Sequence, residues 1–366
     1  MKIILMTWKD LEHPLAGGAE VVNEELAKRL AKDGHEVKLI TGGFSGAKAK
    51  KIKDGYEIIR LGNRVTVYWQ AYRYYKKNLQ GWADVVIDEI NTIPFFAKWY
   101  VKEPNMLFVH QLCREIWFYQ LPKWLGWLGY ITEPLYLRLL NDRKVITVSE
   151  STKQDLLRLG FQKANIHIIS EGLSSPALAE ITAVQKFETP TILSHGSMRA
   201  MKRTLEQVKA FEIAKRAIPD LQLKLSGDAS DAYGQKVLRY IEQSPYRDAI
   251  EYLGRTSNEV RDELMQKAHL ITVTSVREGW GLIVTEANSK GTPAVVYDVA
   301  GLRDSVKHGD TGHISTPTPE ALAEGIVTML TDKQRYESQR QAAWQWSKTI
   351  TFTQSYKDFT QALETI

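Results

Sequence analysis

The feature that most restricts the fold is an alternation of short apolar runs with helical patterns along almost the whole chain. The apolar runs are rich in Val, Ile and Leu, as strands buried on both faces of a parallel sheet are. Residues 19–32, between the first two runs, carry apolar side chains at helical spacing, so the chain opens with a βαβ unit. The expected strands of this first series are residues 3–6, 37–40, 58–61, 85–87, 106–109, 145–148 and 166–169.

A second series of the same kind follows a less patterned segment, residues 173–190, which contains two prolines and is expected to be a linker. Its expected strands are residues 191–194, 221–226, 250–253, 270–273 and 294–297. Its expected helices are residues 204–217, 234–243, 259–266 and 284–290. A length of 366 residues suits two domains better than one core. We therefore predict two doubly wound α/β domains, residues 1–172 and 191–345, that bind ligands at the carboxyl ends of their strands.

The most informative motif lies in residues 277–301, where Glu278 and Glu286 are separated by seven residues. The turn Gly279-Trp280-Gly281 lies between them, and its glycines let backbone N–H groups approach a ligand closely. A helix that starts just after this turn would add an anion site at its N-terminus. Glu278 would then meet a sugar from the loop, and Glu286, about two turns into the helix, would meet a ribose diol.

This segment resembles the retaining glycosyltransferases of family 4 (group 1), whose C-terminal half carries E-x7-E within EG(F/W)GL…EA…G.P.V. The resemblance implies the GT-B fold, with two Rossmann-like domains facing across a cleft. Residues 1–172 would be the acceptor domain and residues 191–345 the nucleotide-sugar donor domain. The final helix, residues 346–366, would cross back to the first domain, with Trp344 and Trp346 helping to anchor it. Leu282 matches the motif too, and Thr285, just before Glu286, is expected to reach a phosphate oxygen.

The loop GSMRAMK, residues 196–202, follows an expected strand and resembles the family's diphosphate loop. Gly196 and Lys202 fall on family positions, but Ser197 stands where the family has an Arg. Arg199, from a shifted loop, or Arg203 is the candidate to replace that cation. Two positive charges would stabilise the charge that develops on a leaving nucleoside diphosphate.

Three further resemblances complete the expected site. Gly17 and Gly18, in the segment HPLAGGAE, match the GGAE loop that faces the donor diphosphate, although a plain βα turn also uses such a pair. His110, at the end of a strand, matches a histidine that lines the sugar or acceptor side. Gly227 and Arg255 follow strands where family members approach or read the nucleotide base. The acceptor would be deprotonated through the leaving phosphate, so His110 is not expected to be the general base.

Charge and aromatic residues are unevenly distributed. Residues 1–172 hold 25 Lys and Arg against 19 Asp and Glu and seven of the ten tryptophans, in a chain of net charge +5. Residues 116–131 contain three of these tryptophans and almost no charge, and basic runs occur at residues 48–53 and 73–77. Two interpretations stay open for the aromatic stretch: peripheral contact with an anionic membrane, or packing in the core or an acceptor groove. The single cysteine, Cys113, excludes an intrachain disulfide and favours a cytoplasmic location, in the membrane case at its inner face.

We therefore expect a hexosyltransferase (EC 2.4 class) that moves a sugar, with retention, from a UDP- or GDP-sugar to a hydroxyl of a glycan or lipid-linked acceptor. We expect no cofactor and no metal, since no Asp-x-Asp triplet or paired His/Cys spacing occurs. A GT-B sugar-nucleotide epimerase is one alternative. A catalytically silent nucleotide-sugar-binding protein is another, and Ser197 is the feature in its favour. Nucleic acid is not an expected partner, because the basic residues are dispersed and no binding motif accompanies them.

Overall fold

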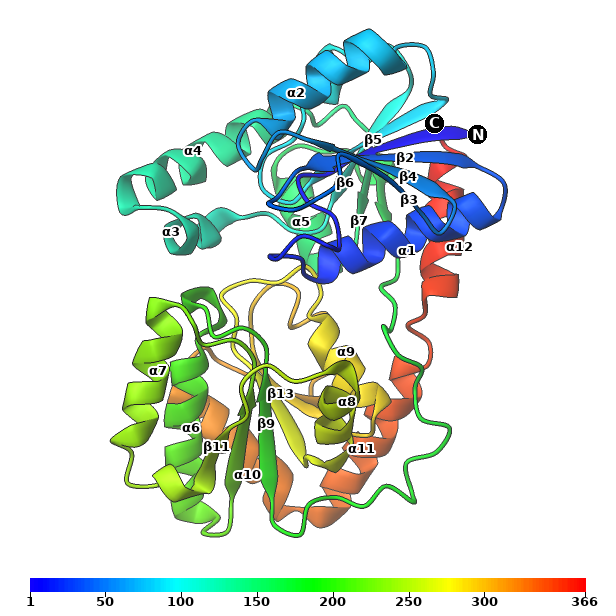
Figure 1. The fold of residues 1–366 in the computed structure, drawn as a ribbon. Coiled ribbons are helices and arrows are strands. Elements are labelled where there is room, and N and C mark those ends of the chain that lie inside the picture. Colours follow the sequence, from blue (N-terminus) through cyan, green and yellow to red (C-terminus); the bar gives the residue numbers. More distant parts are fainter. The chain divides into compact units, whose positions relative to one another are not determined.

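The computed structural model describes residues 1–366 and divides into two compact α/β units (Figure 1). Unit 1 comprises Met1–Trp117, Lys123–Gly172 and Thr351–Ile366, and unit 2 comprises Phe118–Pro122 and Leu173–Ile350. Each unit has its own sheet of mainly parallel strands with helices packed on it, so the α/β class expected from the alternating pattern is confirmed.

The sheet of unit 1 has eight strands in the order β3-β4-β2-β1-β5-β6-β7-β8, all parallel except β3. The strands are β1 (Lys2–Met6), β2 (Glu36–Gly42), β3 (Lys50–Lys53), β4 (Tyr56–Leu61), β5 (Val85–Ile90), β6 (Asn105–Val109), β7 (Val145–Thr147) and β8 (Ile166–Ile168). Strand β1 pairs with β2 on one side and with β5 on the other. The strands before β5 extend the sheet in one direction and the later strands extend it in the other, so the switch point lies between β1 and β5. The sequence KKIK of β3 was not expected as a strand, because an exposed edge strand lacks a buried apolar run.

Helices pack on both faces of this sheet. They are α1 (Gly18–Lys32), α2 (Val67–Tyr74), α4 (Lys123–Leu139), α5 (Glu150–Arg158) and α12 (Phe352–Leu363). A short α3 (Trp117–Gln120), which after Trp117 belongs to unit 2, precedes α4 in the chain. The aromatic stretch 116–131 is divided by this arrangement. Trp117 is buried, whereas Trp124 and Trp127 on α4 are 70% and 57% exposed. No helix in the structure has the length and apolar character that crossing a membrane requires.

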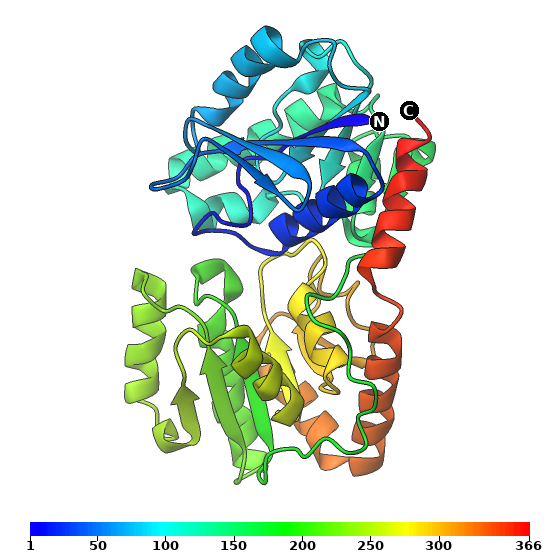
Figure 2. The ribbon, with the colours of Figure 1, turned by 45° about the vertical axis from the view of Figure 1, so that its right-hand side comes forward.

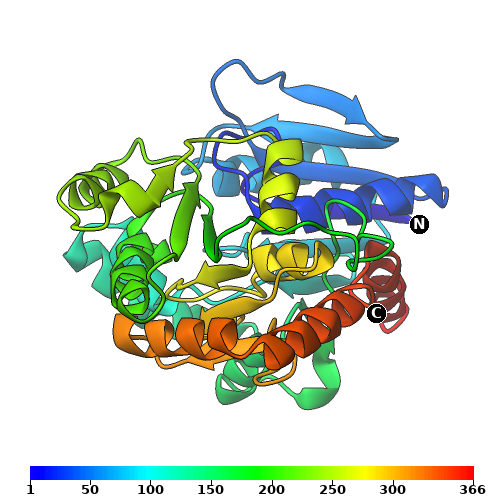
Figure 3. The same cartoon turned by 90° about the horizontal axis from the view of Figure 1, so that it is seen from below.

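Unit 2 has a six-stranded parallel sheet in the order β11-β10-β9-β12-β13-β14. The strands are β9 (Thr191–His195), β10 (Gln222–Ser226), β11 (Ile250–Tyr252), β12 (Leu270–Val273), β13 (Ala294–Tyr297) and β14 (Gly312–Ser315). The helices are α6 (Thr204–Ala217), α7 (Ala232–Glu242), α8 (Asn258–Lys267), α9 (Leu282–Ser289), α10 (Pro319–Thr331) and α11 (Lys333–Ser347). In Figure 3, α10 and α11 follow one another along this unit. The first strand, β9, lies between β10 and β12, so the switch point is at β9 and β12.

Residues 173–190 contain no helix or strand and pack along unit 2. Lys186 Nζ donates to four oxygens of unit 2, each at 2.8 Å, among them the carbonyl oxygens of Gln266 and Gly291. Trp344 Nε1 donates to Leu178 O at 2.9 Å. Hydrogen bonds from side chains to backbone carbonyl oxygens therefore hold this irregular segment on unit 2.

The last helix, α12, packs on unit 1 beside α1 (Figure 2). Its Tyr356 hydroxyl donates to Asp33 at 2.7 Å, and Phe359 is fully buried with its ring centroid 6.4 Å from that of Phe108. The expectation that Trp344 and Trp346 anchor this helix was wrong. Both belong to α11 on unit 2, because the helical run ends at Ser347 and α12 starts only after Thr351, whose hydroxyl caps it.

Candidate functional site

A cavity of about 130 Å³ opens at the carboxyl ends of β9 and β12 in unit 2. Open parallel sheets bind ligands at this edge, where the strand order switches. Most of the lining residues have polar side chains. The lining consists of Ser194, His195, Gly196, Ser197, Lys202, Thr204, Gln207, Thr272, Val273, Ser275 and Ile283.

Lys202 meets Glu278 at this cavity. Lys202 Nζ lies 2.5 Å from Glu278 Oε1, and the Ser275 hydroxyl donates to the same oxygen at 2.5 Å. The two side chains are 31% and 18% exposed, so the pair is only partly shielded from solvent. The two loops are also joined by further hydrogen bonds, since Thr274 Oγ1 donates to Lys202 O and the Val276 N–H donates to Met201 O, each at 2.8 Å. A cation and a carboxylate are thus fixed at the switch point before any ligand arrives.

Two glycines determine where the Glu278 loop lies. Gly281 has φ +99°, and a Cβ there would lie 2.9 Å from the Leu302 side chain. Gly301 has φ +82°, and its Cβ would lie 2.3 Å from Glu278 O. The left-handed conformation at both positions favours glycine. Because α9 begins at Leu282, directly after the first of these turns, Glu286 is its fifth residue. It therefore lies just over one turn into the helix, not the expected two.

Glu286 lies away from the cavity lining, in a buried cluster of charges. Only 7% of the residue is exposed, and Arg261 Nη1 on α8 lies 4.0 Å from its Oε2. Burial raises the pKa of Glu286, and the Arg261 charge opposes that rise. The neighbouring Lys290 pairs with Asp262 at 3.1 Å. The sequence did not single out Arg261, since an Arg on an exposed-looking helix carries no local signal.

Two other residues of the motif contact each other beside the Glu278 loop. The Trp280 indole N–H donates to Thr285 Oγ1 at 2.8 Å, and the ring centroid lies 6.1 Å from that of Trp346. Thr285 is fully buried, so its hydroxyl orients Trp280 in this structure. Ile283, and not the neighbouring Leu282, lines the cavity. The turn at Gly279 connects Glu278 to this support.

The loops after β9 and β10 approach each other closely. Gly227 has φ +140°, and a Cβ there would lie 2.0 Å from Gly196 O, so this contact requires glycine. Arg199 and Arg255 are both exposed, and neither lines the cavity, whereas Ser197 does. The pKa of nearby Asp228 is lowered, first by hydrogen bonds from Ser230 and less by the two arginines. The structure therefore brings Lys202 to the cavity and leaves Arg199 outside.

His195 is a cavity residue that the sequence analysis missed. Burial lowers the pKa of its imidazole to about 4, with a smaller contribution from Arg261, so the ring is neutral near pH 7. The available signal was its position at the carboxyl end of a strand, the same argument that selected His110. Ser275 was also missed, and its role follows only from its contact with Glu278.

In unit 1, the Gly-Gly segment lies at the start of α1, as the βα pattern predicted. The Gly17 N–H donates to Glu20 Oε2 at 2.6 Å, so Glu20 supplies the carboxylate half of a capping box. Lys9 Nζ lies 3.1 Å from the same carboxylate. Gly17 and Gly18 are exposed, which leaves the first turn of α1 open toward solvent at the switch point of its sheet.

His110, just after β6, is buried against α1 and is 5% exposed. Its Nε2 is 3.4 Å from Glu89 Oε1 and 3.3 Å from Asn23 Oδ1. Burial lowers the pKa of His110 to about 3 and raises that of Glu89 to about 8, the latter helped by the Glu20 charge. The two therefore face each other as uncharged groups near pH 7, which fits a structural or orienting histidine.

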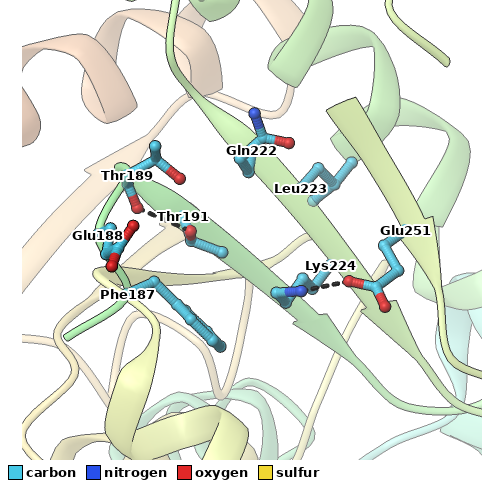
Figure 4. Close-up of a pocket in the computed structure, with 8 residues that line it drawn as sticks. All are labelled: Phe187, Glu188, Thr189, Thr191, Gln222, Leu223, Lys224 and Glu251. Atoms are coloured by element: carbon cyan, nitrogen blue, oxygen red, sulfur yellow. Dashed lines mark hydrogen bonds and ion pairs between the residues drawn. The ribbon is translucent and has the colours of Figure 1, made fainter. Parts of the chain in front are cut away.

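A larger cavity of about 290 Å³ lies elsewhere on unit 2, against the first halves of β9 and β10 (Figure 4). Thr191 and Gln222 at its edge are the first residues of these strands, and Lys224 pairs with Glu251 across it. Because ligands of parallel sheets bind at the opposite, carboxyl end, the smaller cavity is the candidate site. No group of three or more His, Cys, Asp or Glu is arranged to hold a metal ion.

Two family models match the chain. The model "Glycosyltransferase Family 4" matches residues 16–174, and the model "Glycosyl transferases group 1" matches residues 180–346. The chain is 23% identical over 372 aligned residues to N-acetyl-alpha-D-glucosaminyl L-malate synthase of Bacillus anthracis, covering 90% of this chain and 89% of that protein. It is 26% identical to poly(glycerol-phosphate) alpha-glucosyltransferase of Bacillus subtilis over 58% of this chain, which spans only 31% of that protein.

Solved structures with the same fold cover the whole chain. Sucrose-phosphate synthase from Thermosynechococcus elongatus has a TM-score of 0.78 and 18% identity, with 100% of this chain and 98% of that chain covered. The Anabaena protein Alr3699/HepE, solved in complex with UDP-glucose, has a TM-score of 0.71 and 16% identity, with 100% of both chains covered. At these identities the likeness establishes the fold.

Proposed function

Since the chain belongs to the family 4, group 1 glycosyltransferases of GT-B type, we propose that it transfers a sugar from a UDP- or GDP-sugar with retention of configuration. The acceptor in this proposal is a hydroxyl of a glycan or of a lipid-linked saccharide. The observation that carries the proposal is the Lys202–Glu278 pair beside the cavity at the switch point of unit 2.

A nucleotide sugar as donor is supported by chemistry and by likeness. Lys202 presents a positive charge at a strand-end cavity, next to the backbone N–H groups at the start of α9. Such fixed donors favour a diphosphate whose charge grows as it leaves. The HepE structure, which has the same fold, contains UDP-glucose. Arg261, close to Glu286, is the second cation we assign to the donor side, in place of the exposed Arg199.

The proposed reaction needs no protein side chain as nucleophile. The bond between the anomeric carbon and the leaving phosphate oxygen breaks, and a bond from the acceptor oxygen to that carbon forms on the same face. The acceptor proton passes to an oxygen of the leaving diphosphate. Lys202 neutralises the diphosphate, and Glu278 orients the sugar through its hydroxyls while holding Lys202 in place. We propose that no metal takes part.

Nucleotide release from a panel of UDP-, GDP- and ADP-sugars, with and without a membrane-lipid extract, tests the proposal. We expect one donor to be consumed, faster with the extract, and Glu278→Ala to abolish the release. Tight binding of a nucleotide sugar without release from any donor would contradict the proposal and favour a silent binding protein. Glu251→Ala is the matched control, since Glu251 pairs with Lys224 outside the candidate cavity.

A further inference from the structure

The apolar face of α4 points away from the body of unit 1. Six large side chains on this helix, which we call the α4 stripe, are between 53% and 70% exposed. They are Trp124, Trp127, Leu128, Ile131, Leu135 and Leu139. At 3.6 residues per turn they occupy an arc about 120° wide along the whole helix. This is the width of the stripe that a helix of a globular protein normally turns toward its core.

The opposite face of α4 holds the helix on unit 1. Its buried residues are Gly126, Gly129, Glu133 and Leu137. The Glu133 carboxylate accepts the backbone N–H groups of Cys113 at 2.6 Å and Arg114 at 2.7 Å. A Cβ at Gly129 would lie 2.5 Å from the Trp117 ring, so the helix packs closely at that point. The orientation of α4 is therefore fixed by specific contacts, which bury Glu133, two glycines and Leu137 and leave six larger apolar side chains outside.

An exposed apolar patch of this extent marks an interaction surface. The charges beside the α4 stripe indicate what kind of partner covers it. Arg138 is exposed within the arc of the stripe and Lys123 is exposed at its edge, in the first turn of the helix, whereas the one acidic residue, Glu133, is buried on the opposite face. Tryptophan favours the boundary between lipid headgroups and acyl chains, and basic residues are attracted to anionic lipids. In a symmetric contact between the α4 helices of two copies, the same positive charges would meet, and α4 exposes no acidic residue to pair with them.

We propose that α4 is an interfacial membrane helix, whose stripe inserts at the headgroup level of an anionic bilayer while Lys123 and Arg138 contact lipid phosphates. Helices of this kind lie in the plane of the interface. Membrane binding by α4 does not depend on the proposed function. Only the identification of the acceptor as a lipid-linked saccharide rests on it. Unit 1 would then meet its acceptor at the bilayer surface.

Vesicle flotation with the full chain tests this helix directly. Vesicles of equal parts phosphatidylcholine and phosphatidylglycerol should bind the protein, and Trp124→Gln should weaken that binding by about tenfold. Trp69→Gln is the matched control, because Trp69 on α2 is 62% exposed and lies outside the stripe. It should bind as the unchanged protein does. Circular dichroism of both variants checks that the fold is kept.

The charge contribution is tested separately. The double change Lys123→Gln, Arg138→Gln should weaken binding to the mixed vesicles and leave any binding to pure phosphatidylcholine unchanged. Absence of vesicle binding, or equal losses from Trp124→Gln and Trp69→Gln, would overturn the proposal. So would a dimer in light scattering that Trp124→Gln dissociates, because the stripe would then cover a second copy. The assay contains no nucleotide sugar, so its result is independent of whether the proposed transfer occurs.

Discussion

Lys202 and Glu278 are 76 residues apart in the chain, and they form the ion pair that defines the candidate site. The carboxylate also accepts the Ser275 hydroxyl, so its position is fixed by two partners. A cation held this way needs little rearrangement when charge develops on a leaving group, and such preorganisation is often the largest single contribution to catalysis. At the scale of single residues, the site is therefore a positive charge fixed by a carboxylate.

We expect Lys202→Ala to lower donor turnover by at least about a hundredfold, because the charge that stabilises the leaving diphosphate is lost. Steady-state nucleotide release measures this. Lys224→Ala is the control, since it removes another Lys–Glu pair of the same unit away from the cavity. Similar turnover in both variants would exclude Lys202 from the site. Thermal melting should show both variants folded.

The buried carboxyl group of Glu171 is expected to make the free energy of unfolding depend on pH. The residue is 5% exposed, one carboxylate oxygen has no hydrogen-bond partner, and burial raises its pKa to about 8. In the unfolded chain the same group titrates near its usual 4.5. The folded state therefore binds the proton more tightly, so its contribution to stability is complete below pH 4.5. That contribution is lost as the pH rises toward 8.

We expect Glu171→Gln to reduce the loss of unfolding free energy between pH 5 and pH 8, measured by urea denaturation. Glu89, whose pKa burial also raises to about 8, should keep part of the slope in the variant. Glu188→Gln, at an exposed position, should follow the unchanged protein. A slope that Glu171→Gln does not alter would show that Glu171 is ionised in the folded state at neutral pH.

At the scale of elements, the site depends on how the turn before α9 meets the turn after β13. Gly301, in the second turn, lies against the Glu278 carbonyl, and the Glu278 N–H donates to Ala300 O at 3.0 Å. The position of Glu278 thus depends on a backbone contact with a segment that never touches the cavity. A substitution there tests positioning without altering the charges.

We expect Gly301→Ala to lower turnover by about tenfold or more, since a misplacement of about 1 Å can cost that much. Gly309→Ala is closely matched. Both glycines have nearly the same φ, +82° and +81°, but a Cβ at Gly309 meets nothing within 4 Å. The strain is then common to both variants, and only the first displaces Glu278. Equal activity in the two would contradict the positioning role.

At the scale of the whole molecule, each unit carries its candidate residues at the switch point of its own sheet. In unit 1 these are the start of α1 and the strand ends near His110. In unit 2 they are the loops that follow β9 and β12. Carboxyl ends of parallel strands collect loops from distant parts of the chain, so residues far apart in sequence become neighbours.

We expect EDTA to change turnover by less than about twofold, since Lys202 and the start of α9 supply the positive charge that a metal ion would otherwise provide. The same release assay, with EDTA and then with added Mg²⁺ or Mn²⁺, measures this. Activity that EDTA abolishes and a divalent ion restores would overturn the metal-free mechanism.

The sequence by itself determined the order of most strands, of the first helix and of the helices of the second series, because apolar periodicity is local and is imposed by burial on one or both faces. Residues 204–217 were predicted as a helix and form α6 with the same ends. The two strands that were missed, β3 and β14, have short or mixed patterns at the sheet edges. The E-x7-E motif likewise located Glu278 by its neighbours alone.

Only the tertiary structure decided which side chains meet. Lys202 reaches the cavity and Arg199 does not, although only two residues lie between them, because the loop between β9 and α6 turns one inward and the other out. His195 lines the cavity although the sequence analysis did not select it. The aromatic pattern of residues 116–131 fits a buried helix equally well, and contacts of Glu133 and Gly129 with residues 113–117 turn the apolar face of α4 outward. Which face is buried depends on these tertiary contacts, which the periodicity of the helix itself does not contain.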